Sequence, residues 1–180
     1  MALINSLKTT LLGATLCTFA LWQSQAHASS ILPLTVDLPK NAAVAQEHKV
    51  PIVIFATATW CGYCKKLEQN ILEPLLENTN IEEYAEFSQL VVDQRGWSVK
   101  TFDGRTIRMS QLADDFNVQV VPMTLFLDHT GKQIVEPILG LTLEEFYPGN
   151  LERSINQALD ILGNDKRLDI YKMLDEIKAK

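Results

Sequence analysis

The sequence predicts an α/β fold with a central mixed β-sheet flanked by helices, and two patterns carry that prediction. Apolar runs rich in branched residues alternate with helical segments between residues 41 and 128, which indicates parallel strands joined by helices. The last two predicted strands, 123–128 and 133–139, follow each other directly, which indicates an antiparallel pair. We therefore expect one sheet that contains both kinds of pairing.

The first half of the fold is expected to be helix, strand, helix, strand. Residues 41–49 have helix-forming composition, with Asn41 as the expected cap, and the apolar run 50–56 suits a strand buried on both faces. Apolar residues recur at helical spacing over 61–72, and Pro74 is expected to break or kink that helix. Residues 87–93 are expected to form the second buried strand.

The second half begins with a hairpin insert. Residues 99–108 alternate around Asp103-Gly104, which predicts a two-residue turn, and Ser110 is expected to cap a short helix through residue 116. A helix opening at Thr142 and ending near Leu162 follows the last two strands. An amphipathic stretch at 168–177 predicts an extra C-terminal helix.

The N-terminal 28 residues have the features of a secretory signal. Lys8 precedes an apolar run that is too short and interrupted to favour a membrane-spanning anchor, and the segment ends in Ala26-His27-Ala28. We expect cleavage after Ala28 and a periplasmic or otherwise exported domain at 29–180, with its core at about 41–162. A retained membrane anchor is the alternative interpretation.

Charge argues against nucleic acid as a partner. The formal net charge is −6, and it becomes −7 once Lys8 is removed, whereas nucleic-acid binding requires a basic face. A local basic stretch at 94–109 could dock an acidic partner, although a solvated hairpin is the simpler interpretation. We expect a monomer.

The cysteine pattern indicates reactivity. Cys17 leaves with the signal, and the two remaining cysteines, Cys61 and Cys64, enclose only two residues. A disulfide that closes so small a loop restricts the unfolded chain too little to stabilise the fold. A zinc site usually needs four Cys or His ligands, and only His48 and His129 accompany the pair after residue 28. The sequence therefore favours redox chemistry and predicts neither a metal nor another cofactor.

Three motifs together resemble the thioredoxin family. They are the Ala58–Lys66 segment, Ala-Thr-Trp-Cys-Gly-Tyr-Cys-Lys-Lys, at the strand-to-helix junction, Val121-Pro122 before a later strand, and Gly140 after the last strand. The resemblance covers roughly residues 41–162 and implies a thioredoxin fold. It also implies that Pro122 is a cis-proline beside the cysteines, with Val121 offering its backbone to an extended substrate and Trp60 near the site. An ordinary trans proline, and a core role for Trp60, are the alternatives.

The expected chemistry is thiol–disulfide exchange. At a helix start, unpaired backbone N–H groups and the helix dipole stabilise an anion, so Cys61 is expected to have a lowered thiol pKa and to attack, and Cys64 to resolve the mixed disulfide. The sequence departs from the family's pattern in one respect: residues 52–56 lack the buried aspartate that the family has before the cysteines. Glu68 lies on the same helical face as the cysteines and is a candidate proton relay, with a surface pairing to Lys65 as the simpler alternative.

The predicted function is a periplasmic thiol–disulfide oxidoreductase that reduces protein or small-molecule disulfides. Acting as a reductant outside the cytoplasm, it would receive electrons from a membrane thiol carrier, as the resemblance implies. An oxidant that introduces disulfides is the rival within the class. A non-catalytic thioredoxin-fold binding module or a metal chaperone is the rival outside it.

Overall fold

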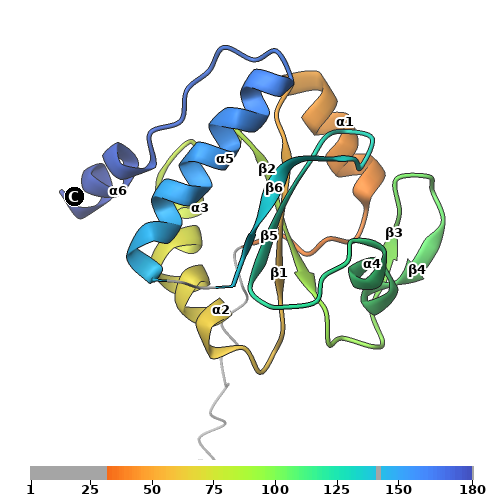
Figure 1. Ribbon diagram of the computed structural model, residues 1–180. Helices are drawn as coiled ribbons and strands as arrows, with labels where there is room; N and C mark the ends of the chain where they lie inside the picture. The colour runs from red at the N-terminus through yellow and green to blue at the C-terminus, as the bar shows by residue number, and fades with distance from the viewer. Residues whose placement is uncertain (1–31, 141–142, 180) are drawn as a thin grey trace, which may run out of the picture.

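A four-stranded mixed sheet forms the centre of the computed structural model, which describes residues 32–140 and 143–179 (Figure 1). The strand order is β2-β1-β5-β6, with β1 parallel to β2 and the other two pairings antiparallel. The strands are β1 (Ile52–Thr57), β2 (Glu86–Val91), β5 (Met123–Leu127) and β6 (Gln133–Leu139). Both kinds of pairing are present, as the sequence predicted.

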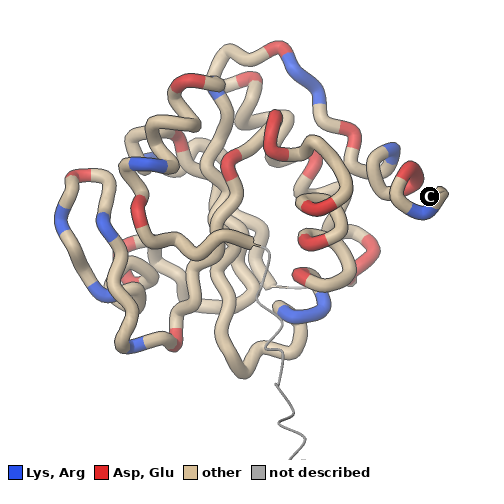
Figure 2. The backbone as a smooth tube through the Cα atoms, turned by 180° about the vertical axis from the view of Figure 1, so that it is seen from behind, with Lys and Arg blue, Asp and Glu red and all other residues tan. Residues whose placement is uncertain are grey.

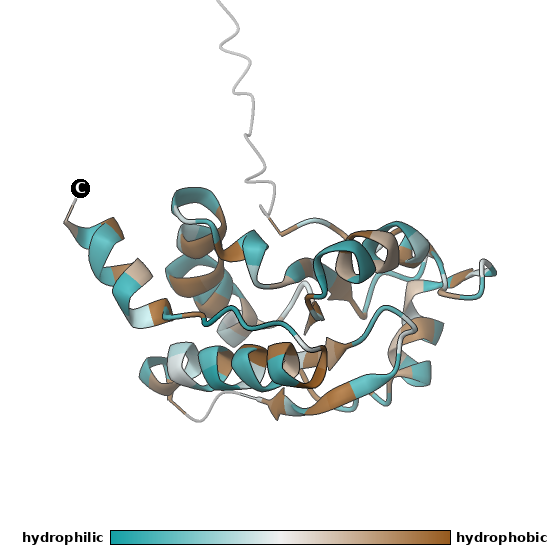
Figure 3. Cartoon of the chain, turned by 90° about the horizontal axis from the view of Figure 1, so that it is seen from above, coloured by the Kyte–Doolittle hydropathy of each residue, from teal (hydrophilic) through white to brown (hydrophobic). Residues whose placement is uncertain are grey.

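Helices cover both faces of this sheet, and successive residues of β1 pack on opposite sides. Ile52 and Ile54 contact the side covered by α1 (Leu38–His48) and α4 (Met109–Asp115). Val53 and Phe55 belong to the core on the other side, where the covering elements are α2 (Gly62–Leu67), α3 (Glu73–Asn78) and α5 (Tyr147–Ile161). This double burial explains the continuous apolar run of β1, and the strands are mostly brown in Figure 3.

The predicted hairpin insert is confirmed as a small second sheet of β3 (Ser98–Lys100) and β4 (Thr106–Arg108). Its turn is longer than expected. Thr101 N–H donates to the Arg105 carbonyl, so three residues form the loop, with Gly104 at a φ of 83°. Figure 2 shows the basic residues along this hairpin, and the Arg105 side chain pairs with Asp103 at 2.6 Å.

Two predicted helix caps are wrong. α1 begins at Leu38, three residues before Asn41, because Asp37 accepts a hydrogen bond from Lys40 N–H and Pro39 fits the first turn. Asn41 instead donates its side-chain amide to Glu86 at 2.8 Å. α4 begins at Met109, and no side chain caps it, so Ser110 lies inside the helix.

The helix after the cysteines continues past the point where Pro74 was expected to break it. A π-helical segment, η1 (Glu68–Leu72), joins α2 to α3, and Pro74 occupies the first turn of α3. The change from α to π bonding just before the proline is therefore the irregularity of this helix. A 3₁₀ turn, η2 (Ile81–Glu83), then leads into β2.

The chain ends in the expected extra helix, α6 (Ile170–Lys178), whose N-cap Asp169 accepts from Lys172 N–H. Before α5 the structure has a 3₁₀ turn, η3 (Glu144–Phe146); the predicted cap Thr142 lies outside the described residues, as does the N-terminal signal. No helix within the described residues has the length and apolar character needed to cross a membrane.

The packed core reaches beyond residues 41–162 at both ends. Leu32 and Leu38 are buried on the N-terminal side, and Leu168 and Ile170 on the C-terminal side. Residues 33–35 also run parallel to β2, because Gln89 N–H donates to the Pro33 carbonyl and Thr35 N–H to the Gln89 carbonyl. This extended segment covers the edge of the sheet at β2.

Candidate active site

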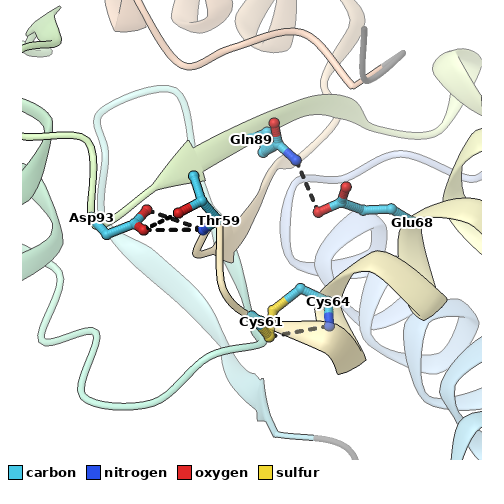
Figure 4. The surroundings of a disulfide bond; sticks show 6 residues. All are labelled: Thr59, Cys61, Cys64, Glu68, Gln89 and Asp93. Atoms are coloured by element: carbon cyan, nitrogen blue, oxygen red, sulfur yellow. Dashed lines mark hydrogen bonds between the residues drawn. A yellow bond between two sulfur atoms is a disulfide. The ribbon is translucent and has the colours of Figure 1, made fainter. Parts of the chain in front are cut away.

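The two cysteines lie where the chain leaves β1 and enters α2 (Figure 4). Cys61 is the N-cap of α2, as the sequence predicted, and its Sγ accepts a hydrogen bond from Cys64 N–H at 3.1 Å. A disulfide joins Cys61 to Cys64. Both cysteines are buried, with Cys61 5 % and Cys64 0 % exposed, so Cys61 is the less buried of the two.

This geometry favours a thiolate on Cys61 after reduction. The first N–H groups of a helix have no partner within the helix, and here one of them points at the Cys61 sulfur. A hydrogen bond to the charged form stabilises that form, and the dipole of the helical segment acts in the same direction. Lys65 and Lys66 are exposed in the same turn, and the Lys66 ammonium lies 5.9 Å from the centre of the Tyr63 ring.

The expected cis-proline is confirmed: the Val121–Pro122 peptide bond is cis. Because Met123 pairs with Ala56, Pro122 enters β5 at the end of the sheet where β1 leads to the cysteines. Trp60 and Val121 line one pocket of about 330 Å³, so the structure brings these two predicted residues together. Trp60 is 73 % exposed, so the alternative core role for this residue is wrong.

Glu68 points at the sheet and not at the surface. Its Oε1 accepts a hydrogen bond from the Gln89 side chain at 2.9 Å, and Gln89 is buried in β2. Burial raises the pKa of the Glu68 carboxyl above its usual value, while the polar groups of Thr57 and Gln89 act in the opposite direction. Within the described residues no ion pair joins Glu68 to Lys65, so the simpler surface interpretation fails.

Sequence reasoning missed two polar residues near the cysteines, Gln89 and Asp93. Both carboxylate oxygens of Asp93 accept from Thr59 N–H, at 3.1 and 3.2 Å, and the Thr59 hydroxyl also donates to Asp93. Burial favours the neutral acid, but the hydrogen bonds from Thr59 hold the pKa of Asp93 below its usual value. The signal for this residue was its place directly after a strand parallel to β1, where the carboxyl ends of both strands meet.

The structure offers no metal centre among residues 32–140 and 143–179, where no three His, Cys, Asp or Glu side chains form a group that could hold an ion. His48 ends α1, and His129 lies in the turn between β5 and β6. The cysteine pair can carry two electrons by itself, since a dithiol and its disulfide differ by two electrons and two protons.

A family model decides the relationship of this chain. The model, described as a thioredoxin-like domain, matches residues 38–145, which include the cysteines, Glu68, Asp93 and Pro122. The chain belongs to the thioredoxin-like family. No curated protein matches it.

Solved thioredoxin structures are similar to this thioredoxin-like chain at low identity. Thioredoxin from Fasciola hepatica is 21 % identical, with a TM-score of 0.48, and the match covers 68 % of this chain and 99 % of that one. A mutant thioredoxin from Halobacterium salinarum is 25 % identical, with a TM-score of 0.45 and 71 % and 95 % coverage. Mitochondrial thioredoxin 3 from Saccharomyces cerevisiae is 21 % identical, with a TM-score of 0.44 and 69 % and 93 % coverage.

The thioredoxin fold, the family match and the Cys61–Cys64 pair together make this protein a thiol–disulfide oxidoreductase. The sheet order and the helices on both faces agree with the predicted fold, including the hairpin insert and the C-terminal helix.

Proposed function

We propose that this oxidoreductase is exported and reduces disulfides in the periplasm. The observation that carries the catalytic part is the arrangement of the cysteine pair: the Cys61 sulfur accepts a helix N–H at the start of α2, and Cys64 is the more deeply buried of the two. The less buried Cys61 is the better placed of the two to meet a substrate disulfide, and the fully buried Cys64 is placed to attack Cys61. Protein disulfides and small-molecule disulfides are the proposed substrates.

The reaction begins with the reduced pair. The Cys61 thiolate attacks one sulfur of a substrate disulfide, the bond between the two substrate sulfurs breaks, and the second substrate sulfur leaves as a thiolate that takes up a proton. Cys64 then loses its proton and attacks the Cys61 sulfur. The Cys61–Cys64 disulfide forms, the remaining substrate sulfur leaves as a thiol, and two electrons have passed from the protein to the substrate.

Glu68 is the proposed acceptor of the Cys64 proton. A carboxyl group whose pKa is raised by burial holds and releases a proton closer to neutral pH than an exposed one does. The Glu68 carboxyl lies one helical turn after Cys64. We propose that it transfers the proton in place of the aspartate that β1 lacks. Trp60, Val121 and Pro122 are the proposed substrate-binding residues, since Trp60 and Val121 line the same pocket.

The reducing direction predicts a low reduction potential and a supply of electrons. Reductases of this fold lie near about −270 mV and strong oxidants near about −120 mV, and we place this protein nearer the first value. Electrons would then come from a membrane thiol carrier. Equilibration with glutathione, combined with thiol trapping in cells, tests this: a pair that is oxidised in the periplasm, with a potential above about −150 mV, makes the protein an oxidant instead.

Export is tested separately by the mass of the protein recovered from the periplasm. Cleavage after Ala28 would leave a chain that begins at Ser29. Such a chain keeps the buried Leu32 and the residues that pair with β2. An intact N-terminus on a membrane-bound protein would instead support a retained anchor.

A further inference from the structure

The pocket beside the cysteines is lined by three segments that lie far apart in the sequence. Trp60 comes from the segment before Cys61, Val92 directly follows β2, and residues 118–121 belong to the segment before Pro122. The lining is apolar except for Gln119. Trp60 is largely exposed, so few side-chain contacts hold it at the pocket, and its position depends on how the backbone of this segment is held.

Two contacts hold this segment to the chain after β2: the Val92 N–H donates to the Thr57 carbonyl at 2.9 Å, and the Asp93 carboxylate binds Thr59. Thr59 immediately precedes Trp60, and Asp93 immediately follows Val92. Asp93 accepts from both the backbone N–H and the hydroxyl of Thr59, so it joins the two neighbours of the pocket residues directly (Figure 4). Cys61 N–H donates to the Ala58 carbonyl and closes the 58–61 turn. Among the described residues no backbone-to-backbone hydrogen bond of this kind involves Thr59 or Trp60.

We propose that Asp93 is a positioning residue for protein substrates, which holds Thr59 and thereby fixes the Trp60 and Val92 side of the pocket. The proposal rests on the proposed function in disulfide exchange. Asp93 touches neither the sulfurs nor a substrate, and it acts through Thr59. A protein disulfide must place neighbouring residues in the pocket, whereas a small disulfide needs only to reach Cys61.

Comparing a protein disulfide with a small disulfide distinguishes a positioning role of Asp93 from a purely structural one. Losing Asp93 should weaken exchange with a protein disulfide selectively, mainly by raising KM, because the pocket no longer has a fixed shape. A general loss of folded protein would lower the rates with both kinds of disulfide equally. An effect through charge alone would move the titration of Cys61 and change both rates together.

The chain offers a matched control in Asp128. Its Oδ1 accepts three hydrogen bonds, from Thr130 N–H at 2.8 Å, the Thr130 hydroxyl at 2.6 Å and Lys132 N–H at 3.0 Å. Like Asp93 it is partly buried and holds a short segment at a strand end, but that segment is the turn between β5 and β6. Asp128→Asn removes the same charge as Asp93→Asn, at a turn that does not line the pocket, and should leave exchange unchanged.

The experiment measures reduction of insulin and of hydroxyethyl disulfide by the full mature protein. For Asp93→Asn we expect kcat/KM with insulin to fall about tenfold, and with hydroxyethyl disulfide to change less than about twofold. The Asn side chain has one oxygen that accepts and one NH2 group that only donates, so it cannot accept on both sides as the carboxylate does. Thr59→Val should show part of the insulin defect. Thr59→Ser, which keeps the hydroxyl, should reduce insulin as fast as the wild type does.

Three results would overturn the positioning role. They are an equal loss with both disulfides in Asp93→Asn, an insulin defect of the same size in Asp128→Asn, and a Thr59→Ser variant as slow as Thr59→Val. A wild-type protein that reduces neither disulfide would overturn the proposed function itself, and the positioning role with it.

Discussion

The carboxyl group of Glu68 shows what the sequence could and could not predict about single residues. Helical spacing predicted that Glu68 lies one turn after Cys64, and in the structure its backbone N–H donates to the Cys64 carbonyl. Its partner Gln89 is in another strand, and only the packing of α2 and η1 on the sheet brings the two together. Local spacing was therefore enough to predict Glu68 as a candidate proton relay. Its hydrogen bond to Gln89 and its raised pKa depend on contacts between distant segments.

The raised pKa of Glu68 predicts a pH-dependent contribution to stability. The folded protein binds the proton more tightly than the unfolded chain does, so this contribution is fully present below the unfolded value of about 4.5 and is lost as pH rises through the folded value. Urea unfolding at a series of pH values should show this loss in the wild type, and Glu68→Gln should lack that part of it. Identical pH dependence in the two proteins would contradict the burial of this charge.

A comparison with Glu86 distinguishes the effect of a buried carboxyl on stability from a role of Glu68 in the reaction. Its pKa is also raised by burial, but it opens β2 at the end of the sheet opposite the cysteines. In a single-turnover experiment Glu68→Gln should slow the release of substrate from the mixed disulfide by about tenfold, and Glu86→Gln should not. Equal release rates in all three proteins would remove the proton-transfer role.

The titration of Cys61 tests the local argument from the helix start. The hydrogen bond from Cys64 N–H and the dipole both favour the thiolate, so the thiol should titrate below the value of about 8.5 for free cysteine. Thiolate absorbance of the reduced protein against pH measures this, with a Cys61→Ser variant to subtract Cys64. A titration at the free-cysteine value would contradict the assignment of the nucleophile.

At the scale of the elements, strands were easier to predict than helix ends. The apolar run predicted at 50–56 became β1, because a strand buried on both faces must be apolar throughout. Asn41 and Ser110 were misplaced as caps, since several polar residues near a helix start can serve and packing decides among them. The π segment η1 has no sequence signature of its own.

The turn between β5 and β6 gives a stability prediction for the contact between the hairpin insert and the sheet. Gly131 has a φ of 86°, and a Cβ there would collide with the ring of Phe102 in the β3–β4 loop. Gly163 has a φ of 68° with open space around it. Gly163→Ala should cost about 1–2 kcal/mol of unfolding free energy, from the backbone alone.

Gly131→Ala should cost more, by about 1–3 kcal/mol beyond that value, because the side chain also has to displace Phe102. Urea denaturation of the two variants beside the wild type measures the difference. Equal losses would show that the β3–β4 loop does not pack on this turn.

At the scale of the whole molecule, the site is assembled from segments that the sequence keeps far apart. The Cys61–Cys64 segment, Asp93 and the Val121–Pro122 bond come from three connections at one end of the sheet. The motifs could be found in the sequence because each is local. The contact between Thr59 and Asp93 could not, because it depends on the parallel register in which Thr57 faces Val91.

The division of roles between the two cysteines is the central claim, and trapping of mixed disulfides tests it most directly. Cys64→Ser should accumulate substrates covalently bound to Cys61, because the resolving attack is lost, and Cys61→Ser should be inactive and trap almost nothing. Mass spectrometry of the adducts identifies the linked cysteine. Equal trapping by the two variants, or adducts on Cys64 in preference to Cys61, would contradict the account.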